Sequence, residues 1–572
     1  MTEKIMELYN IWCQKVTDKT LADELKSVKG DEAAIEDRFF KELDFGTAGL
    51  RGVIGAGSNR MNIYTVGRAT QGFADYINAT YKNGSVAIAY DSRINSDLFS
   101  RTAACVFAAN GIKVWLYPEL APTPMLSFAV RYYGCVGGVV VTASHNPAEY
   151  NGYKAYGDDG CQLGGEECDK ITKAINNTDI FEGIKSIDFD TALAEGKICY
   201  VGEDCYEDYY KNVLMQSVDS DLVGESGLKV IYTPLHGTGN KPVREILKRI
   251  GVTDVTIVKE QEQPDGNFPT APYPNPEIRQ PFECALALAR QVKPDLLLAT
   301  DPDADRVGIA VPEGDDYRLL TGNEVGAMLL DYVLMRRSQK GTLPQNPVAV
   351  KSIVSTSICD KIATKYGCEM RDVLTGFKYI GEQIALLEKD NHPERYVFGF
   401  EESYGYLAGT YVRDKDAVVA SMLICEMAAY YRTQGKSLVD VINGIYAEYG
   451  RYLHRTTSFT FKGASGMEQM ATIMNTLHTE KRESVADYKV VSVADYLTSQ
   501  YTDCVTGEVK TLTLPKADVI AFMLENNNCI MVRPSGTEPK IKVYVTSVAE
   551  DTTKAEEINA ILTKEAAKML GQ

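Results

Sequence analysis

The chain has 572 residues, 45% of them hydrophobic, and a formal net charge of −18 at pH 7. This length predicts several domains of roughly 150 residues each, and the hydrophobic content is sufficient for a core in each. The negative charge argues against a nucleic-acid-binding scaffold, since no broad basic field would attract a polyanion, but a local Arg/Lys cluster could still bind small anionic substrates.

The composition also argues against a secreted or membrane-bound protein. Thirteen cysteines occur without a CxxC pair or zinc-ligand spacing, which favours buried, reduced thiols. The N-terminal segment lacks the apolar stretch of a signal peptide, and no run of about 18 apolar residues occurs. We therefore expect a cytoplasmic protein without membrane contacts, and no feature of the sequence predicts an oligomeric state.

The chain begins with predicted helices. Apolar residues between positions 5 and 16 recur at helical spacing, and a second helix is expected over about residues 31–43. The following loop, residues 45–52, is rich in Gly and Ala, so the backbone can approach a ligand closely there. Arg51 in this loop can reach a phosphate, although the loop on its own also fits an ordinary glycine-rich turn.

The loop at residues 142–147 is the most informative part of the first α/β segment. It follows residues 137–141, a small and β-branched run that predicts a buried strand. Ser144 is therefore expected at the carboxyl end of a strand, where open α/β sheets bind ligands. A serine hydroxyl reacts only with help from a base, a metal or a positive field. His145 is a candidate base or a loop-shaping donor, and Lys154, ten residues further on, is a candidate proton shuttle.

Three aspartates follow the predicted strand at residues 296–300. Asp301, Asp303 and Asp305 alternate, so their carboxylates can turn toward one point. Clustered anions repel each other unless a cation neutralises them, and all-oxygen ligands suit Mg²⁺. An EF-hand is excluded, because Arg306 stands where that loop requires glycine. Arg306 is itself a candidate to hold an oxygen of a phosphoryl group.

A serine beside a divalent cation indicates phosphoryl transfer. The cation would take a phosphate oxygen at Ser144 as one ligand, which adds Ser144 to the predicted metal site. A serine hydrolase fits less well, because the chain has no G-x-S-x-G elbow and only five histidines.

A third α/β segment offers groups that could bind a sugar. The predicted strand at residues 396–400 ends at Glu401, and Glu401 and Ser403 offer acceptors for adjacent sugar hydroxyls, with Glu402 as a further candidate. Lys378 and Lys415 add positive charge, although each alone is more often a solvated lysine. The further candidates of this segment are Thr375, Gly376, Lys378 and Lys415.

From about residue 450 the pattern changes to a smaller α+β domain that could close over the others. One loop in it has the composition of a phosphate-binding loop: two cations, two hydroxyls and exposed backbone N–H groups, from Arg533, Ser535, Gly536, Thr537 and Lys540. No Walker A sequence occurs, which argues against an ATP-dependent kinase.

Taken together, these loops resemble the α-D-phosphohexomutase family. The resemblance implies an α/β fold of four domains, with three related mixed α/β units and a C-terminal α+β domain around a central cleft. We place the domains at residues 1–220, 221–322, 323–448 and 449–572. The matching stretches, in the order that the family has them, are residues 45–52, 142–147, 301–306, 375–378, 401–405 and 533–540.

The same resemblance implies a reaction. Ser144 would carry a phosphate and Mg²⁺ would be held by the three aspartates, while phosphate moves between C1 and C6 of a hexose. Phosphoserine gives its group to the substrate, and the sugar 1,6-bisphosphate that results returns its other phosphate to Ser144. Such a bisphosphate would also serve as the activator. A closed C-terminal domain would exclude water that could hydrolyse the phosphoserine.

The sugar is predicted from residues 401–405 and from the chain length, which resemble the phosphoglucomutase branch that includes phosphopentomutase activity. Tyr404 and Gly405 stand where mannose and glucosamine branches often carry Gly-His, which puts more weight on Lys154 or His145 as acid or base. We expect glucose 1-phosphate and glucose 6-phosphate as substrates, then pentose phosphate, then mannose phosphate. The alternatives are a metal-dependent sugar phosphatase, a sugar-phosphate sensor and a bisphosphate synthase.

Overall fold

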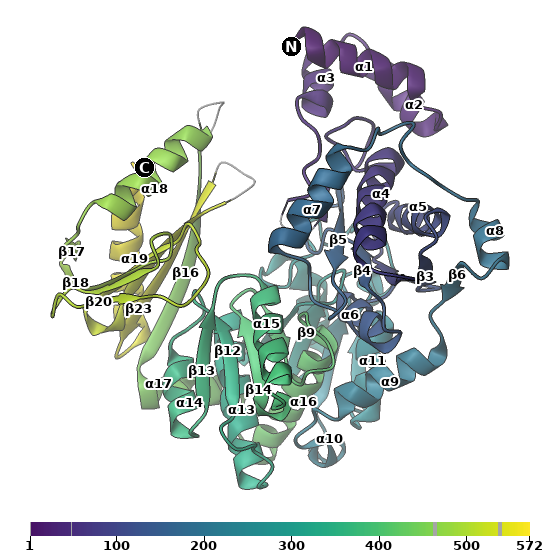
Figure 1. The fold of residues 1–572 in the computed structure, drawn as a ribbon. Helices are drawn as coiled ribbons and strands as arrows, with labels where there is room; N and C mark the ends of the chain where they lie inside the picture. Colours follow the sequence, from purple (N-terminus) through teal and green to yellow (C-terminus); the bar gives the residue numbers. More distant parts are fainter. Residues whose placement is uncertain (1, 47–48, 462–465, 536–539, 572) are drawn as a thin grey trace.

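The computed structural model describes residues 2–46, 49–461, 466–535 and 540–571 (Figure 1). In these residues the strands form four sheets that follow one another along the chain. The predicted fold class, four domains of which three are α/β, is confirmed. None of the helices described combines the length and the apolarity that a membrane span requires.

Three short helices precede the first sheet: α1 (Glu3–Lys15), α2 (Lys19–Ser27) and α3 (Glu32–Phe39). Each is capped at its start by a side-chain oxygen of the preceding residue, which satisfies an otherwise unpaired backbone N–H. Trp12 is fully buried between them and makes edge contacts with Phe39, Tyr64 and Phe181. Helix α3 ends before the predicted residue 43, because Leu43 N bonds to Ser58 O instead.

Unit 1 is built on a mixed six-stranded sheet of order β1-β5-β4-β2-β3-β6, in which β2, β3, β4 and β6 are parallel. Strand β4 coincides with the predicted strand and is buried throughout. Its glycines let helix α6 pack closely: a Cβ at Gly138 would lie 2.6 Å from Val130. The elements are β1 (Gly49–Val53), α4 (Ile63–Thr80), β2 (Ser85–Tyr90), α5 (Ser96–Ala109), β3 (Lys113–Leu116), α6 (Thr123–Tyr132), β4 (Gly137–Val141), β5 (Tyr150–Tyr156), α7 (Gly165–Asn176), α8 (Phe189–Ala194) and β6 (Ile198–Tyr200), followed by α9 (Glu203–Leu214) and α10 (Ser220–Ser226).

Unit 2 has a five-stranded sheet of order β11-β10-β9-β7-β8, in which β7, β8 and β9 are parallel. A long loop with two 3-10 turns joins β8 to α12. The elements are β7 (Lys229–Thr233), α11 (Asn240–Arg249), β8 (Asp254–Ile257), η1 (Lys259–Gln261), η2 (Gln280–Phe282), α12 (Glu283–Val292), β9 (Leu296–Thr300), β10 (Val307–Glu313) and β11 (Asp316–Leu320).

Unit 3 has a four-stranded sheet of order β13-β12-β14-β15, with β15 antiparallel to β14. Units 1, 2 and 3 thus share one plan, a parallel core with antiparallel strands at one edge. The elements are α13 (Gly322–Gln339), β12 (Val348–Ser352), α14 (Ile358–Lys365), β13 (Glu369–Val373), α15 (Phe377–Lys389), η3 (Pro393–Arg395), β14 (Tyr396–Glu401), β15 (Gly405–Leu407), α16 (Ala417–Thr433) and α17 (Leu438–Tyr449).

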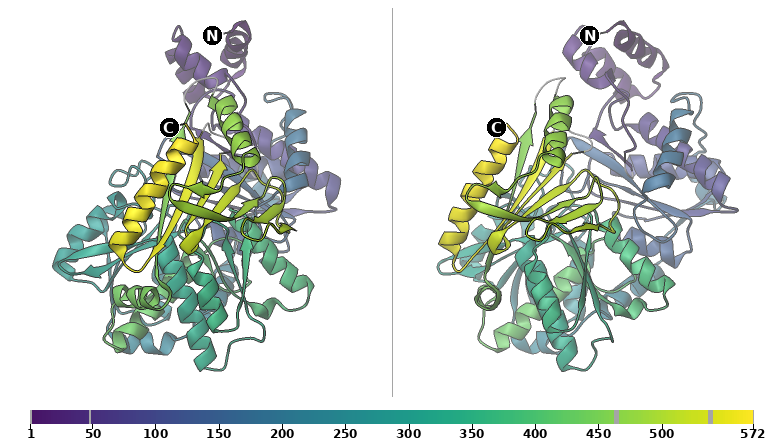
Figure 2. Two further views of the ribbon diagram at one scale, coloured as in Figure 1. Left: turned by 90° about the vertical axis from the view of Figure 1, so that its left-hand side faces the viewer. Right: turned by 60° about the vertical axis from the view of Figure 1, so that its left-hand side comes forward.

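Unit 4 has a largely antiparallel sheet, and Figure 2 shows α18 and α19 on its outer face. The other face packs on unit 3 through a small apolar cluster that includes Val354, Leu374 and Tyr496. The elements are β16 (Arg451–Thr460), α18 (Gly466–Thr479), β17 (Ser484–Val485), β18 (Tyr488–Asp495), β19 (Gln500–Asp503), β20 (Val509–Thr511), β21 (Ile520–Leu524), η4 (Glu525–Asn527), β22 (Cys529–Pro534), β23 (Lys540–Ala549) and α19 (Thr552–Met569).

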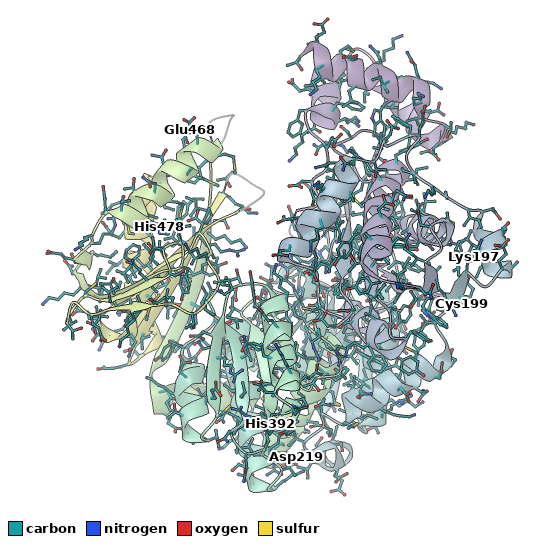
Figure 3. The ribbon with its side chains drawn as sticks, viewed as in Figure 1. Lys197, Cys199, Asp219, His392, Glu468 and His478 are labelled. Carbon is teal, nitrogen blue, oxygen red and sulfur yellow. The ribbon has the colours of Figure 1, made fainter. Side chains whose placement is uncertain are left out.

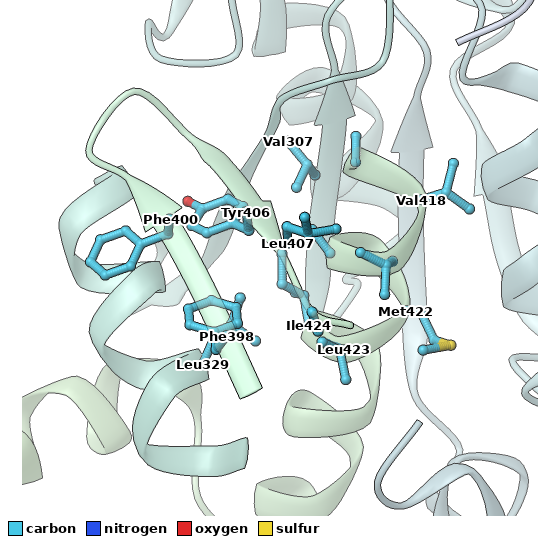
Figure 4. Close-up of a cluster of buried hydrophobic side chains, with 14 of the residues drawn as sticks. Val307, Leu329, Phe398, Phe400, Tyr406, Leu407, Val418, Met422, Leu423 and Ile424 are labelled. Atoms are coloured by element: carbon cyan, nitrogen blue, oxygen red, sulfur yellow. The ribbon is translucent and has the colours of Figure 1, made fainter. Parts of the chain in front are cut away.

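Helix α16 lies at the centre of the largest apolar core, which joins units 1, 2 and 3. It is hydrophobic on nearly every face, which is the pattern of a helix buried on all sides. Figure 4 shows Leu423 and Ile424 of this helix below Leu407 of unit 3 and Val307 of unit 2, in one cluster of buried side chains. Unit 4 has a separate core between its sheet and its helices.

His478 in α18 gives unit 4 a pH-dependent contact (Figure 3). Its Nε2 lies 2.9 Å from Asp518 and its Nδ1 lies 3.0 Å from Asp495. The hydrogen bond to Asp518 raises the pKa of His478 above its ordinary value, with a further contribution from Asp495 that burial opposes. Because the pKa of His478 is higher in the folded protein than in the unfolded chain, its protonated form stabilises the fold. This contribution is complete below the unfolded pKa of about 6.5 and is lost as the pH rises through the folded pKa.

We therefore expect His478→Gln to lower the stability of unit 4 by about 1 kcal/mol below pH 6.5 and to have little effect at high pH. Urea unfolding of the whole chain at several pH values, followed in unit 4, measures the difference from wild type. His392→Gln is the matched control, because that histidine is 60% exposed and contacts Glu394 only at the surface. Parallel pH profiles for His478→Gln and wild type would contradict the prediction.

Candidate active site

A cavity of about 770 Å³ lies where the four units meet, and each unit contributes to its wall. Its volume is typical of sites that bind small molecules. The structure brings together at this wall nine of the side chains and backbone positions predicted for the site: Arg51, His145, Arg306, Thr375, Gly376, Glu401, Ser403, Arg533 and Lys540.

Ser144 lies three residues after the end of β4, buried beside the cavity, with a φ of 52°. A non-glycine residue in this left-handed region is strained, and such strain is concentrated at functional sites. The Ser144 hydroxyl donates to Asp301 Oδ2 at 2.9 Å and lies 3.2 Å from His145 Nδ1. Burial, followed by the charges of Arg306 and Arg51, lowers the pKa of His145 well below its usual range. A neutral imidazole therefore lies beside the hydroxyl.

Arg93 supports this loop and is a residue that the sequence analysis missed. Its guanidinium donates to the backbone carbonyls of Ser144 at 2.6 Å, Pro147 at 2.8 Å and Tyr150 at 3.0 Å. The guanidinium also lies over the ring of Phe268 in unit 2, 5.0 Å from its centroid. The position of Arg93 just after β2, at the same sheet edge as the serine loop, is the signal that could have identified it.

Asp301, Asp303 and Asp305 lie in the loop after β9, and each is almost completely buried. One carboxylate oxygen from each lies within 4.8 Å of the others, an arrangement that could hold a metal ion. Burial, followed by repulsion from Asp303 and Asp305, raises the pKa of Asp301 well above its usual range. The three side chains therefore occupy one small volume, as their alternation along the chain predicts.

The surroundings of these aspartates fit a divalent cation. Lys154 Nζ lies 2.8 Å from Asp303 and Lys415 Nζ lies 3.2 Å from Asp305, so two lysines face three carboxylates. One buried oxygen each of Asp303 and Asp305 has no hydrogen-bond partner in the part of the chain described. An all-oxygen set with residual negative charge and unsatisfied acceptors is what a hard cation such as Mg²⁺ prefers.

Two arginines flank this centre on the cavity wall. Arg51 on β1 lies 3.3 Å from Asn146 Oδ1, in the loop that carries Ser144. Arg306 follows the aspartates and lies 2.7 Å from Glu277, a residue of the long loop of unit 2. Both arginines line the cavity, and both charges act on His145 beside the serine.

The sugar-loop candidates lie at the end of β14. Glu401 accepts a hydrogen bond from Gly376 N at 2.7 Å, which joins the two predicted substrate loops of unit 3. Both Glu401 and Glu402 line the cavity. Glu402 accepts from Ser352 at 3.0 Å, and burial, followed by the charge of Glu401, raises the pKa of Glu402 to about 7. Ser403 also lies at the wall.

Lys378 differs from the other candidates of unit 3. It is not among the residues that line the cavity; its ammonium lies over the ring of Tyr379, 5.2 Å from the centroid. A phosphate-binding role for Lys378 therefore stays a prediction from sequence. Lys415 lies behind the wall, between Asp305 and Asp414.

Unit 4 places cations opposite the serine loop. Arg533 on β22 and Lys540 on β23 line the cavity, and Ser535 N donates to Lys540 O at 2.8 Å. Gly536 and Thr537 lie outside the described residues. Lys542 also lines the cavity, and burial, followed by Lys540 and Arg533, lowers its pKa. The sequence analysis missed Lys542, although the alternation along β23 puts it on the same face as Lys540.

Models of the phosphoglucomutase/phosphomannomutase family match most of the chain. Its α/β/α domains I, II and III match residues 42–181, 207–314 and 321–449, and its C-terminal domain matches residues 478–564. Among curated relatives, the phosphoglucomutase of Staphylococcus saprophyticus is 37% identical and covers 95% of this chain and 96% of its own. That of Staphylococcus aureus strain RF122 is 35% identical, with coverages of 96% and 98%.

Solved structures share the fold at lower identity. The open form of pp63/parafusin, a phosphoglucomutase from Paramecium, has a TM-score of 0.68 at 18% identity and covers 93% of this chain and 97% of its own. A phosphoglucomutase/phosphomannomutase family protein from Burkholderia thailandensis has a TM-score of 0.64 at 16% identity, with coverages of 92% and 97%. The resemblance seen in the sequence is thus confirmed, and this chain belongs to the phosphoglucomutase/phosphomannomutase family.

Proposed function

We propose that this protein acts as a phosphoglucomutase, which interconverts α-D-glucose 1-phosphate and glucose 6-phosphate. One observation carries the proposal. The hydroxyl of Ser144, whose backbone is strained, lies 2.9 Å from Asp301. Asp301 belongs to a cluster of three buried aspartates beside a cavity that all four units line. The glucose substrate is supported by the names of relatives that match over nearly their full length.

In this proposal the phosphate on Ser144 moves to the free hydroxyl of the bound sugar phosphate. The bond from phosphorus to Ser144 Oγ breaks as the bond to the sugar oxygen forms. The sugar hydroxyl loses its proton to a base, and Ser144 Oγ takes up a proton to re-form its hydroxyl. His145 and Lys154 are the candidates for this proton transfer, because His145 Nδ1 lies 3.2 Å from Ser144 Oγ and Lys154 Nζ lies 2.8 Å from Asp303. The bisphosphate then turns, and its other phosphate returns to Ser144 with the reverse proton movement.

Charge complementarity supports the assignment of the remaining residues. Arg51 and Arg306 would hold the moving phosphoryl group, and Arg533, Ser535, Gly536, Thr537 and Lys540 would hold the remote phosphate. Thr375, Gly376, Lys378, Glu401, Ser403 and Lys415 would bind the sugar and its phosphates. Mg²⁺ held by Asp301, Asp303, Asp305 and phosphorylated Ser144 would supply positive charge to that group.

The proposal extends to the activator, the partners and the location. Glucose 1,6-bisphosphate would phosphorylate Ser144 and so activate the enzyme, and small sugar phosphates would be the partners. All thirteen cysteines are free thiols, which supports a reducing compartment such as the cytoplasm.

A coupled assay tests the proposal with glucose, mannose and ribose 1-phosphates, each with Mg²⁺ and again with added chelator. We expect the highest kcat/KM for glucose 1-phosphate, stimulation by glucose 1,6-bisphosphate, and loss of turnover with chelator. Higher kcat/KM for ribose or mannose 1-phosphate would assign the pentose or mannose mutase instead. Release of inorganic phosphate in step with substrate loss would identify a phosphatase.

A further inference from the structure

Arg306 reaches the cavity as one half of an ion pair with Glu277. The pair joins Arg306 Nη1 to Glu277 Oε1 at 2.7 Å, and the two side chains are 18% and 30% exposed. Both residues line the cavity. A partly buried arginine–carboxylate pair of this kind fixes the direction of the guanidinium, because its geometry is specific.

The backbone around Glu277 is held firmly. Glu277 N donates to the side-chain oxygen of Asn275 at 3.0 Å, which fixes the turn through Pro276. Pro276 packs directly on β10, where a Cβ added to Gly308 would lie 2.3 Å from the Pro276 carbonyl oxygen. The carboxylate is therefore presented at a set position beside Arg306, the residue that immediately precedes β10.

A second carboxylate competes for the same guanidinium. Arg306 Nε already lies 3.6 Å from Asp305 Oδ1, within ion-pair distance but beyond hydrogen-bond distance, and neither buried atom has a hydrogen-bond partner among the described residues. A small rotation of the side chain would close this gap and place Arg306 on one of the proposed metal ligands. Attraction between opposite charges at low local dielectric favours that movement. The contact with Glu277 opposes it.

We propose that Glu277 is a positioning residue: it holds Arg306 toward the cavity, where the phosphoryl group is transferred, and away from Asp305. This inference rests on the proposed function for its effect on turnover, because Arg306 acts there on the moving group. Its effect on Asp305 concerns the aspartate cluster alone and does not depend on the substrate.

A double-mutant cycle with Glu277→Ala and Arg306→Ala tests the turnover effect. We expect Glu277→Ala to lower kcat for glucose 1-phosphate by about 10- to 100-fold with a smaller change in KM, since a displacement of about 1 Å can cost this much. Glu277→Gln keeps an oxygen acceptor and should recover most of the loss. In the Arg306→Ala background, Glu277→Ala should change kcat less than about 3-fold.

A binding experiment gives a second readout that is independent of turnover. Mn²⁺ serves as the probe, and its binding is measured by electron paramagnetic resonance without substrate. We expect Mn²⁺ to bind more weakly to Glu277→Ala than to wild type, because Arg306 then forms a closer ion pair with Asp305. Binding should recover in the double variant, which lacks Arg306. Glu283→Ala is the matched control; Glu283 pairs with Arg279 on the same part of unit 2, but its side chain is 61% exposed.

Thermal denaturation of each variant identifies any loss of folding. An equal effect of Glu277→Ala on kcat in the wild-type and Arg306→Ala backgrounds would overturn the inference. Unchanged Mn²⁺ binding in Glu277→Ala would overturn it as well. A changed preference between glucose and mannose 1-phosphates, independent of Arg306, would also overturn it, since Glu277 would then contact the sugar. Absence of mutase turnover in wild type would instead remove the proposed function, and the Mn²⁺ experiment would still decide the role of Glu277.

Discussion

Ser144→Ala should abolish mutase turnover, with a loss of about 10⁴-fold or more, because it removes the oxygen that would carry the phosphate. The Ser144 hydroxyl is buried and donates to Asp301, and alanine offers no oxygen in its place. The coupled assay measures the loss, and mass spectrometry of the purified protein should show phosphate on wild type and none on the variant at this residue.

The fold of this variant should survive. Alanine keeps a Cβ at φ 52°, so the backbone strain is unchanged, and the change in the free energy of unfolding should be about 1 kcal/mol. Ser100→Ala is the matched control, because Ser100 is also buried but lies in α5, where it donates to the backbone oxygen of Asp97. Substantial turnover by Ser144→Ala would contradict the proposed phosphoserine.

Asp301→Asn should lower kcat by about 10³-fold, since it removes one of the three charges that would hold Mg²⁺ and weakens the contact with Ser144. Burial, followed by repulsion from Asp303 and Asp305, raises the pKa of Asp301, so its charged form is disfavoured unless a cation neutralises it. When both proteins are compared without Mg²⁺, the variant should therefore be at least as stable as wild type. Its activity should be far lower.

Two measurements test this prediction together: activity against Mg²⁺ concentration, and the melting temperature with and without Mg²⁺. Mg²⁺ should raise the melting temperature of wild type but not of the variant. Asp316→Asn is the matched control, because Asp316 lies on β11 of the same sheet and its side chain is 70% exposed. A variant that kept wild-type dependence on Mg²⁺ would contradict the assignment of this cluster.

Sequence patterns predicted the parts of the site that depend on local order. Ser144, Asp301 and Glu401 each come at or just after the end of a buried apolar strand, so strand periodicity alone placed them at sheet edges. The fold class followed from the same alternation of strands and helices. These features depend on neighbours within a few residues along the chain.

The parts that were missed depend on contacts between distant segments. The position of Arg93 just after β2 makes it a candidate, but its role depends on backbone carbonyls 51 to 57 positions further along the chain. Glu277 lies in a proline-rich loop without periodicity, and its role becomes visible only beside Arg306. The neighbours of Lys154 and Lys415 were likewise hidden, because their aspartate partners belong to another unit. No one-dimensional pattern encodes such pairings.

The burial of α16 among three units has a consequence for how the molecule can come apart. This helix is the last but one before unit 4, yet its side chains complete a core that begins in unit 1. A nascent chain that ends before α16 therefore exposes apolar surface on every unit already made. In the complete chain, heat should melt units 1, 2 and 3 in one cooperative step. Unit 4 has its own core and contacts unit 3 through the small cluster that includes Val354, so it should melt in a separate step.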